Sequence, residues 1–170
     1  MRFLGLLLLF AGALLVGCAR EIPPAQVGVK FSSTSGAEQQ ILKPAVVWVL
    51  PRQRLVLYPT NIRNASYTRG GYGGAERGGN DSIMASTNEG AILPVDVTVS
   101  YHVDPGNVMT VYRNFGTNNI QQIQTEFIRP ATNWAVNTVS GQKSVFELTS
   151  KERAQFGHRI KALLVPKLAA

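Results

Sequence analysis

Residues 87–105 read TNEGAILPVDVTVSYHVDP, and this stretch decides the fold. From residue 95 to residue 103 apolar and polar side chains alternate strictly. This period of two predicts a β-strand with one buried face and one solvent-facing face. Together with residues 81–87 and a turn at residues 88–90, the pattern predicts a hairpin whose second arm is residues 91–103. The apolar positions of that arm are Val95, Val97, Val99, Tyr101 and Val103.

Three further strands are predicted upstream of the hairpin. Residues 25–31 (AQVGVKF), 41–50 (ILKPAVVWVL) and 54–58 (RLVLY) are rich in β-branched and aromatic side chains. Pro51 and Pro59 follow the last two runs, and proline is tolerated at strand ends and on edge strands. We therefore expect separate short strands rather than one long one.

Three amphipathic helices are predicted after the strands. Apolar residues recur at helical spacing through residues 108–115, 120–139 and 156–164. Asp104 and Pro105 predict the N-cap and first position of the first helix, Pro130 a kink in the second, and Thr149 with Glu152 a capping box on the third. The other predicted limits are Gly116, a start near Asn118 or Asn119, Gly141, and an interruption at Pro166.

This order of elements predicts an α+β fold. Strands come first and helices after, so a mostly antiparallel sheet in the N-terminal strands should carry helices packed against it in the C-terminal half. Tyr112 and Trp134 fall on apolar helical stripes, where we expect core packing rather than stacking on a ligand.

The N-terminus reads MRFLGLLLLFAGALLVGCAR, which has the layout of a secretory signal: one basic residue, a short apolar run and then small residues. Leu15-Val16-Gly17-Cys18 resembles the lipobox of bacterial lipoproteins. The resemblance implies a signal peptide over residues 1–17 and an acylated Cys18, the only cysteine of the chain, anchored to membrane lipids. By the sorting rule of enterobacteria, Ala19 implies transport outward. The competing interpretation is an uncleaved membrane anchor that happens to contain a cysteine. Residues 18–24 are expected to be a linker, and residues 25–170 one domain.

The glycine-rich stretch at residues 69–79 raises the question of nucleic-acid binding. The chain carries 17 Lys+Arg against 10 Asp+Glu, and arginine with glycine and an aromatic residue can wrap single-stranded RNA. An exported protein does not meet cellular RNA, so we expect no nucleic-acid partner. The stretch is predicted to be a flexible inter-strand loop, with Arg69, Tyr72 and Arg77 as candidates for contact with lipid head groups or a neighbouring subunit.

No catalytic constellation can be assembled from the sequence. His102 and His158 are far apart, Asp96 is expected on the solvent-facing side of its strand, and Asp104 is assigned to a helix cap. Residues 141–144 (GQKS) end like a phosphate-binding loop, but the full G-x-x-x-x-G-K-[ST] pattern is absent. We therefore expect no enzyme activity, no metal and no cofactor.

Beyond the signal peptide, the chain resembles the SPFH or Band 7 family, which includes stomatins, prohibitins, flotillins and the bacterial HflK and HflC proteins. The most specific motif is Thr87-Asn88-Glu89-Gly90 leading into residues 95–101 (VDVTVSY) and Val103-Asp104-Pro105. Supporting matches are Val27-Gly28-Val29, Pro51, Tyr58 with Arg63, residues 128–131 (IRPA) and residues 147–153 (ELTSKER).

The resemblance implies a non-catalytic, membrane-attached protein that forms homo-oligomers and organises membrane proteins or restrains a membrane protease. Family members usually continue into a long coiled coil, whereas no heptad run is present here, so a large ring is not expected. The lipobox implies a lipid-anchored protein of the bacterial cell envelope, facing the periplasm in a Gram-negative host. The alternative is a monomeric envelope lipoprotein that binds a ligand or a cell-wall component, and a hydrolase is a third candidate.

Overall fold

The computed structural model describes residues 19–32, 39–50, 53–70, 80–150 and 153–169. The chain divides into two compact units. Unit 1 contains the chain up to Ile62 together with His102–Asn118, and unit 2 contains Arg63–Tyr101 together with the chain from Asn119 onward. The motif at residues 87–105 therefore contributes to both units.

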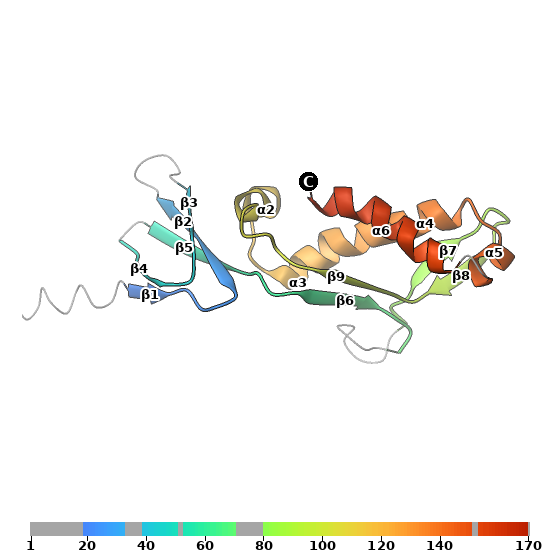
Figure 1. Ribbon diagram of the computed structural model, residues 1–170, viewed down its shortest axis with the longest axis horizontal. Helices are drawn as coiled ribbons and strands as arrows, with labels where there is room; N and C mark the ends of the chain where they lie inside the picture. Colours follow the sequence, from blue (N-terminus) through green and yellow to red (C-terminus); the bar gives the residue numbers. More distant parts are fainter. Residues whose placement is uncertain (1–18, 33–38, 51–52, 71–79, 151–152, 170) are drawn as a thin grey trace, which may run out of the picture. The chain divides into compact units, whose positions relative to one another are not determined.

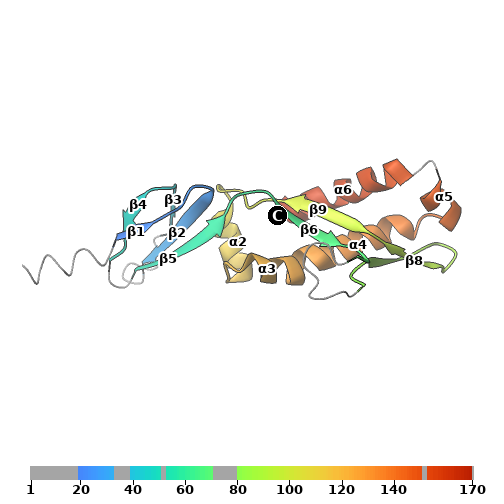
Figure 2. The same cartoon turned by 90° about the horizontal axis from the view of Figure 1, so that it is seen from below.

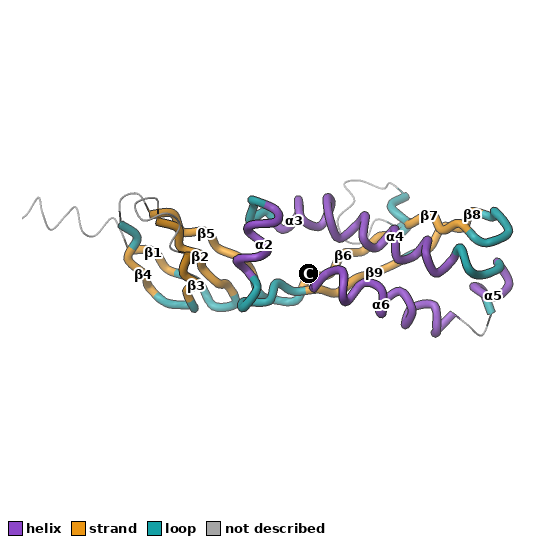
Figure 3. Tube along the Cα trace, turned by 90° about the horizontal axis from the view of Figure 1, so that it is seen from above, coloured by secondary structure: helices purple, strands orange, loops and turns teal. Residues whose placement is uncertain are grey.

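Unit 1 is built on a three-stranded antiparallel sheet whose central strand is β2 (Gln26–Ser32). On one side β2 pairs with β3 (Gln39–Leu42), and on the other with β5 (Gln53–Pro59). A separate two-stranded ribbon joins β1 (Ala19–Glu21) to β4 (Val46–Trp48), as the tube in Figure 3 shows. The strands predicted at residues 25–31 and 54–58 are confirmed.

The core of unit 1 gathers around the centre of β2. Val27 and Val29 are buried, and so are Tyr58 on β5 and Ile22, which follows β1. Gly28 makes room for Ile22, because a Cβ at Gly28 would lie only 2.7 Å from the Ile22 Cδ1 atom. The absence of a side chain at Gly28 thus lets the segment after β1 pack directly on the sheet.

One helix, α2 (Val108–Phe115), completes unit 1. Val108 is fully buried, and the Tyr112 ring packs on Phe31 of β2 with 4.4 Å between ring centroids. Beyond the helix, the Tyr58 hydroxyl donates a hydrogen bond to the carbonyl of Thr117 at 2.7 Å. The predicted core position of Tyr112 is therefore supported, since its ring lies against the sheet.

Three predictions for unit 1 need correction. The strand predicted over residues 41–50 is two strands, β3 and β4, because Pro44 cannot donate a ladder hydrogen bond. Residues 19–21, predicted as linker, form β1. Asp104 does not cap α2: its carboxylate accepts from the Gly106 N–H at 3.0 Å and holds a turn, and the helix begins at Val108.

The strands of unit 2 form two separate antiparallel pairs. One pairs β6 (Arg63–Tyr67) with β9 (Val97–Tyr101), and the other is the hairpin of β7 (Ile83–Ser86) and β8 (Ile92–Val95). The predicted hairpin and turn are confirmed. The second arm, however, is divided at Asp96 and changes partner from β7 to β6, and β6 was not predicted.

The helices of unit 2 are α3 (Ile120–Ile123), a π-helical segment η1 (Gln124–Ile128), α4 (Arg129–Ser140), α5 (Val145–Thr149) and α6 (Arg153–Ala169). Helices α4 and α6 lie side by side along the strands (Figures 1 and 2). The apolar face of β9 packs against the core that they bury. That core includes Ala65, Ala85, Ala135, Val136, Ile160 and Leu164. The overall α+β fold is therefore as predicted.

Helix limits in unit 2 follow the sequence only in part. Asn119 is the N-cap of α3, as predicted, and accepts from the Gln121 N–H at 3.1 Å. The irregularity expected at Pro130 is the π-helical segment that precedes it. The third helix was predicted to open at Thr149, but Thr149 ends α5, and Glu152, its predicted capping partner, lies outside the described residues. Ser144 and Glu147 form a capping box at the start of α5.

Two predictions for the last helices are also wrong. Helix α6 continues through Pro166 to Ala169, although Pro166 has no N–H to donate to the Ala162 carbonyl. Trp134, expected in the core, is 44 % exposed, and the Lys167 Nζ lies 4.1 Å from the centroid of its ring. Trp134 therefore takes part in a surface cation–π contact.

Side chains of α4 cover the free edge of β7. The Asn137 side chain accepts from the Ser86 N–H at 3.0 Å and donates to the Met84 carbonyl at 3.2 Å. The Ser140 hydroxyl donates to the Ser86 carbonyl at 2.9 Å. These bonds satisfy backbone groups that a third strand would otherwise pair with. On the other strand of the hairpin, Pro94 lies opposite Met84 and has no N–H to offer.

Candidate functional site

The β1–β4 ribbon lies at the point where the described chain begins. Cys18, the predicted lipidation site, lies outside the described residues. The next residue, Ala19, is paired with Trp48, and Glu21 is paired with Val46. The Ile22 N–H donates to the Ala45 carbonyl at 2.9 Å, which extends the ribbon by one more hydrogen bond. The chain after Cys18 is therefore folded from its first residue.

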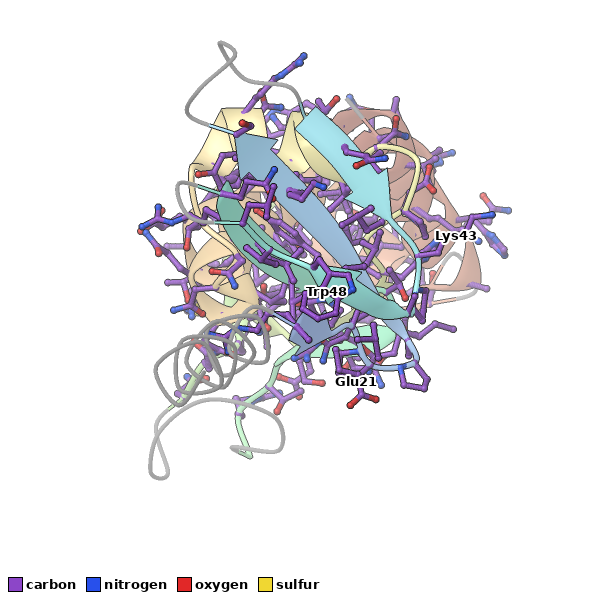
Figure 4. All side chains as sticks on the ribbon, turned by 90° about the vertical axis from the view of Figure 1, so that its left-hand side faces the viewer. Glu21, Lys43 and Trp48 are labelled. Carbon is purple, nitrogen blue, oxygen red and sulfur yellow. The ribbon has the colours of Figure 1, made fainter. Side chains whose placement is uncertain are left out.

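The outer face of this ribbon is apolar and exposed. Val46 is 66 % exposed, Trp48 57 % and Leu50 59 %. These three residues alternate with the half-buried Val47 and Val49, so they share one face of the extended chain. We call Val46, Trp48 and Leu50 the ribbon face; Figure 4 shows Trp48 in the foreground. Such a cluster on a protein surface indicates a contact with another apolar surface.

Charged residues border the ribbon face. Glu21 lies opposite Val46 in the pairing and is exposed. Lys43 is exposed as well, and Figure 4 labels Glu21 and Lys43 together with Trp48. The surface thus combines an aromatic and aliphatic centre with charges of both signs around it.

The two ends of the glycine-rich segment are held in unit 2. The Arg69 N–H donates to the Asp96 carboxylate at 3.1 Å, and the Asp81 N–H donates to the Thr68 carbonyl at 3.3 Å. Asp96 is exposed, as predicted, but lies between β8 and β9 rather than within a strand. Tyr72 and Arg77, the other two predicted contact residues, lie outside the described residues.

Arg129 links the base of this segment to the helices. Its guanidinium forms an ion pair with Asp81 and lies over the Tyr67 ring, 5.5 Å from the centroid. Tyr67 is buried, and its hydroxyl is the one buried side-chain polar atom of the described part that has no hydrogen-bond partner. Sequence reasoning noticed Arg129 only within a motif; its role depends on β6, which was not predicted.

The titration of the buried tyrosines reflects their packing. Burial raises the pKa of Tyr67 to about 12, although the nearby Arg129 opposes the shift. Burial, with a smaller contribution from Tyr112, raises the pKa of Tyr58 to about 12. Burial also raises the pKa of Tyr101 above its ordinary value. These phenols therefore remain protonated near neutral pH and act as packing and hydrogen-bonding groups.

The other candidate residues do not come together. His102 belongs to unit 1 and His158 to unit 2, and both are exposed. In the GQKS segment, Gly141 ends α4, the Lys143 Nζ pairs with the Glu147 carboxylate at 3.1 Å, and Ser144 caps α5. Across the described ranges, three or more His, Cys, Asp or Glu side chains nowhere gather as a metal site would require. Among the helices described, none is long and apolar enough to cross a bilayer.

The described chain starts with an antiparallel β-ribbon and sheet, and its C-terminal helices pack on the paired strands β6 and β9. These elements define an α+β fold with an exposed apolar surface on the ribbon. The chain belongs to the SPFH domain / Band 7 family, whose model matches residues 20–170. Members of this family are generally membrane-associated scaffolds and are generally non-catalytic. A search of curated proteins gave no significant match.

Proposed function

We propose that the chain is a lipoprotein of the bacterial cell envelope whose SPFH domain serves as a non-catalytic scaffold or regulator of membrane proteins. The observation that carries the proposal is the position of β1. Ala19, directly after Cys18, is paired with Trp48 in the ribbon of unit 1. A lipid on Cys18 would therefore hold the folded domain at the membrane surface without an intervening tether.

Acylation of Cys18 supplies the energy for this attachment. Each buried methylene contributes about 0.8 kcal/mol, so a terminus with two or more acyl chains stays bound where a single chain would dissociate. The domain then faces the periplasm in a Gram-negative host. Family membership supports the remaining parts of the proposal: a homo-oligomer that organises membrane proteins or restrains a membrane protease.

Mass spectrometry and membrane fractionation test the anchor. We expect the mature protein to begin at an acylated Cys18 and to remain in the membrane fraction. Globomycin, or the substitution Cys18→Ala, should prevent that processing and raise the mass by the uncleaved peptide. An unchanged mature mass and unchanged fractionation in both cases would refute the lipid anchor.

Native mass measurement in mild detergent tests the scaffold. Crosslinking in intact envelopes followed by pull-down should recover homo-oligomers and a membrane-protein partner. A purely monomeric species over a wide concentration range, with no crosslinked partner, would contradict scaffolding and favour the ligand-binding lipoprotein instead.

A further inference from the structure

We propose that the ribbon face inserts into the membrane interface beside the lipidated N-terminus and forms a second membrane contact of unit 1. Trp48 is its central residue, with Val46 and Leu50 on either side. The partner is the head-group and upper acyl region of a bilayer. This inference rests on the proposed anchoring at Cys18, and its test is arranged so that the two can fail separately.

The first argument is the composition of the surface. Residues 44–50 read PAVVWVL, so the segment has no polar side chain on either face of the strand. A strand that faces water on one side normally alternates apolar and polar residues. Here the inward residues Val47 and Val49 are half-buried, and the outward residues are more than half exposed. The outer face therefore has the chemistry of a buried face.

The second argument is continuity with the anchor. Paired strands lie about 4.8 Å apart, and consecutive Cα atoms about 3.8 Å. Ala19, the residue that follows the proposed lipidation site in the sequence, is paired with Trp48 and so lies beside the ribbon face. A lipid attached to Cys18 would bring the bilayer surface to the ribbon face without any movement of the domain.

The third argument is the type of residue exposed. Tryptophan concentrates at membrane–water interfaces, where its ring is apolar and its N–H can bond with head groups or water. Lys43 is exposed and can meet anionic head groups. Glu21, opposite Val46, favours the head-group layer over the hydrocarbon centre. The charges thus set a shallow depth of insertion.

Fluorescence quenching by lipids tests the proposal, because the chain has two tryptophans. Trp134 belongs to unit 2 and is 44 % exposed, so it is a matched reporter that is not part of the ribbon face. Full-length protein is expressed in a bacterium, purified as the mature form, and reconstituted into phosphatidylethanolamine–phosphatidylglycerol vesicles that contain spin-labelled lipid. The Trp134→Phe variant then reports on Trp48, and the Trp48→Phe variant reports on Trp134.

We expect shallow spin labels to quench Trp48 at least about twofold more strongly than Trp134, because only Trp48 would lie within the interface. Adding Val46→Lys to the Trp134→Phe variant should reduce that quenching, since a charge would be placed on the inserting face. If Trp48 were quenched no more than Trp134 in vesicle-bound protein, the inference would be overturned and the anchor would stand.

Two further outcomes separate the alternatives. If Trp48 is shielded from aqueous iodide but not quenched by lipid, and the shielding depends on protein concentration, a second copy covers the ribbon face and the inference fails. If mass spectrometry finds no acyl chain but vesicle-bound protein still shows quenched Trp48, the ribbon face binds the bilayer and the proposed anchor fails.

Discussion

Two valine-rich strands of this protein, β4 in unit 1 and β9 in unit 2, face their surroundings in opposite ways. Each is paired with a single neighbouring strand. On the outer face of β9 the Ser100 hydroxyl donates to Asn64 at 2.7 Å, and the Thr98 hydroxyl donates to Ser66 at 3.2 Å. On the outer face of β4 stand Val46 and Trp48. Strand β9 is therefore adapted to water, and β4 is not.

The contrast between the outer faces of β4 and β9 shows how the surroundings of a valine-rich strand can be inferred from its sequence. The polar residues of β9 show which face meets solvent, while its valines pack on the helices of unit 2. Where such polar residues are missing, as in β4, the strand needs either protein or lipid on both sides. The following substitutions test whether the two strands really differ in this way.

The largest effect is expected from a lysine at matched valines. Val99→Lys should lower the free energy of unfolding of unit 2 by about 3 kcal/mol, because it places an unpaired ammonium against the core. Val46→Lys should change the free energy of unfolding of unit 1 by less than about 0.5 kcal/mol, because that valine is exposed. Urea unfolding of the mature protein in mild detergent measures both. Equal losses would show that β4 is as buried as β9.

A smaller effect is expected at the protected edge of β7. Asn137→Ala removes the bonds to the Ser86 N–H and the Met84 carbonyl and should cost about 1–2 kcal/mol. Thr138→Ala is the control, since that hydroxyl bonds only the Trp134 carbonyl of its own helix. Urea unfolding with amide hydrogen exchange at Ser86 checks the prediction. Equal stability of the two variants would mean that the Asn137 hydrogen bonds do not stabilise the edge of β7.

Two buried tyrosines, Tyr58 in unit 1 and Tyr67 in unit 2, should differ by a smaller amount in what their hydroxyls contribute to stability. Tyr58→Phe should cost about 1 kcal/mol, because it breaks the bond to the Thr117 carbonyl. Tyr67→Phe should be neutral or slightly stabilising, because it removes a buried hydroxyl that has no partner among the described residues. Thermal unfolding of both variants decides the matter. A clear loss for Tyr67→Phe would reveal a partner for that hydroxyl.

The smallest effect is expected on the solvent-facing cap of α5. Hydrogen bonds from the Ser144 N–H and from Lys143 hold the pKa of Glu147 below its ordinary value of 4.5. Its stabilising contribution is therefore present above that value and is lost as the pH falls through the lowered native pKa. Glu147→Gln should speed amide exchange in α5 at neutral pH but not in strong acid. Identical exchange rates in the variant and the original protein at neutral pH would show that the Glu147 carboxylate does not stabilise α5.

The sequence predicts best where one periodicity dominates. The alternation through β9 and the apolar stripe of α6 give the right faces, because each face is buried against a single core. The division of the predicted second arm at Asp96 could not be foreseen, since β8 and β9 pair with strands that are distant from each other in sequence. Strand β6 has few β-branched residues and was missed for that reason.

The candidate site was less predictable. The resemblance to a lipobox singles out Cys18 as a candidate, but the neighbourhood of Ala19 depends on pairing with a strand that begins at Val46. The signal for the ribbon face was nevertheless present, because residues 44–50 lack any polar side chain. The placement of Trp134 failed because a local pattern does not show which turn of a helix meets the core.

The interleaved course of the chain has a consequence for how the protein is made. Unit 1 needs α2, yet β6 to β9 of unit 2 are synthesised before that helix. During synthesis the first sheet must therefore remain without Val108 and the rest of α2 until more than half of the chain has been made. Truncation anywhere before residue 118 should leave both units incomplete, and a fragment of residues 1–118 or 63–170 would keep one unit whole only together with a piece of the other.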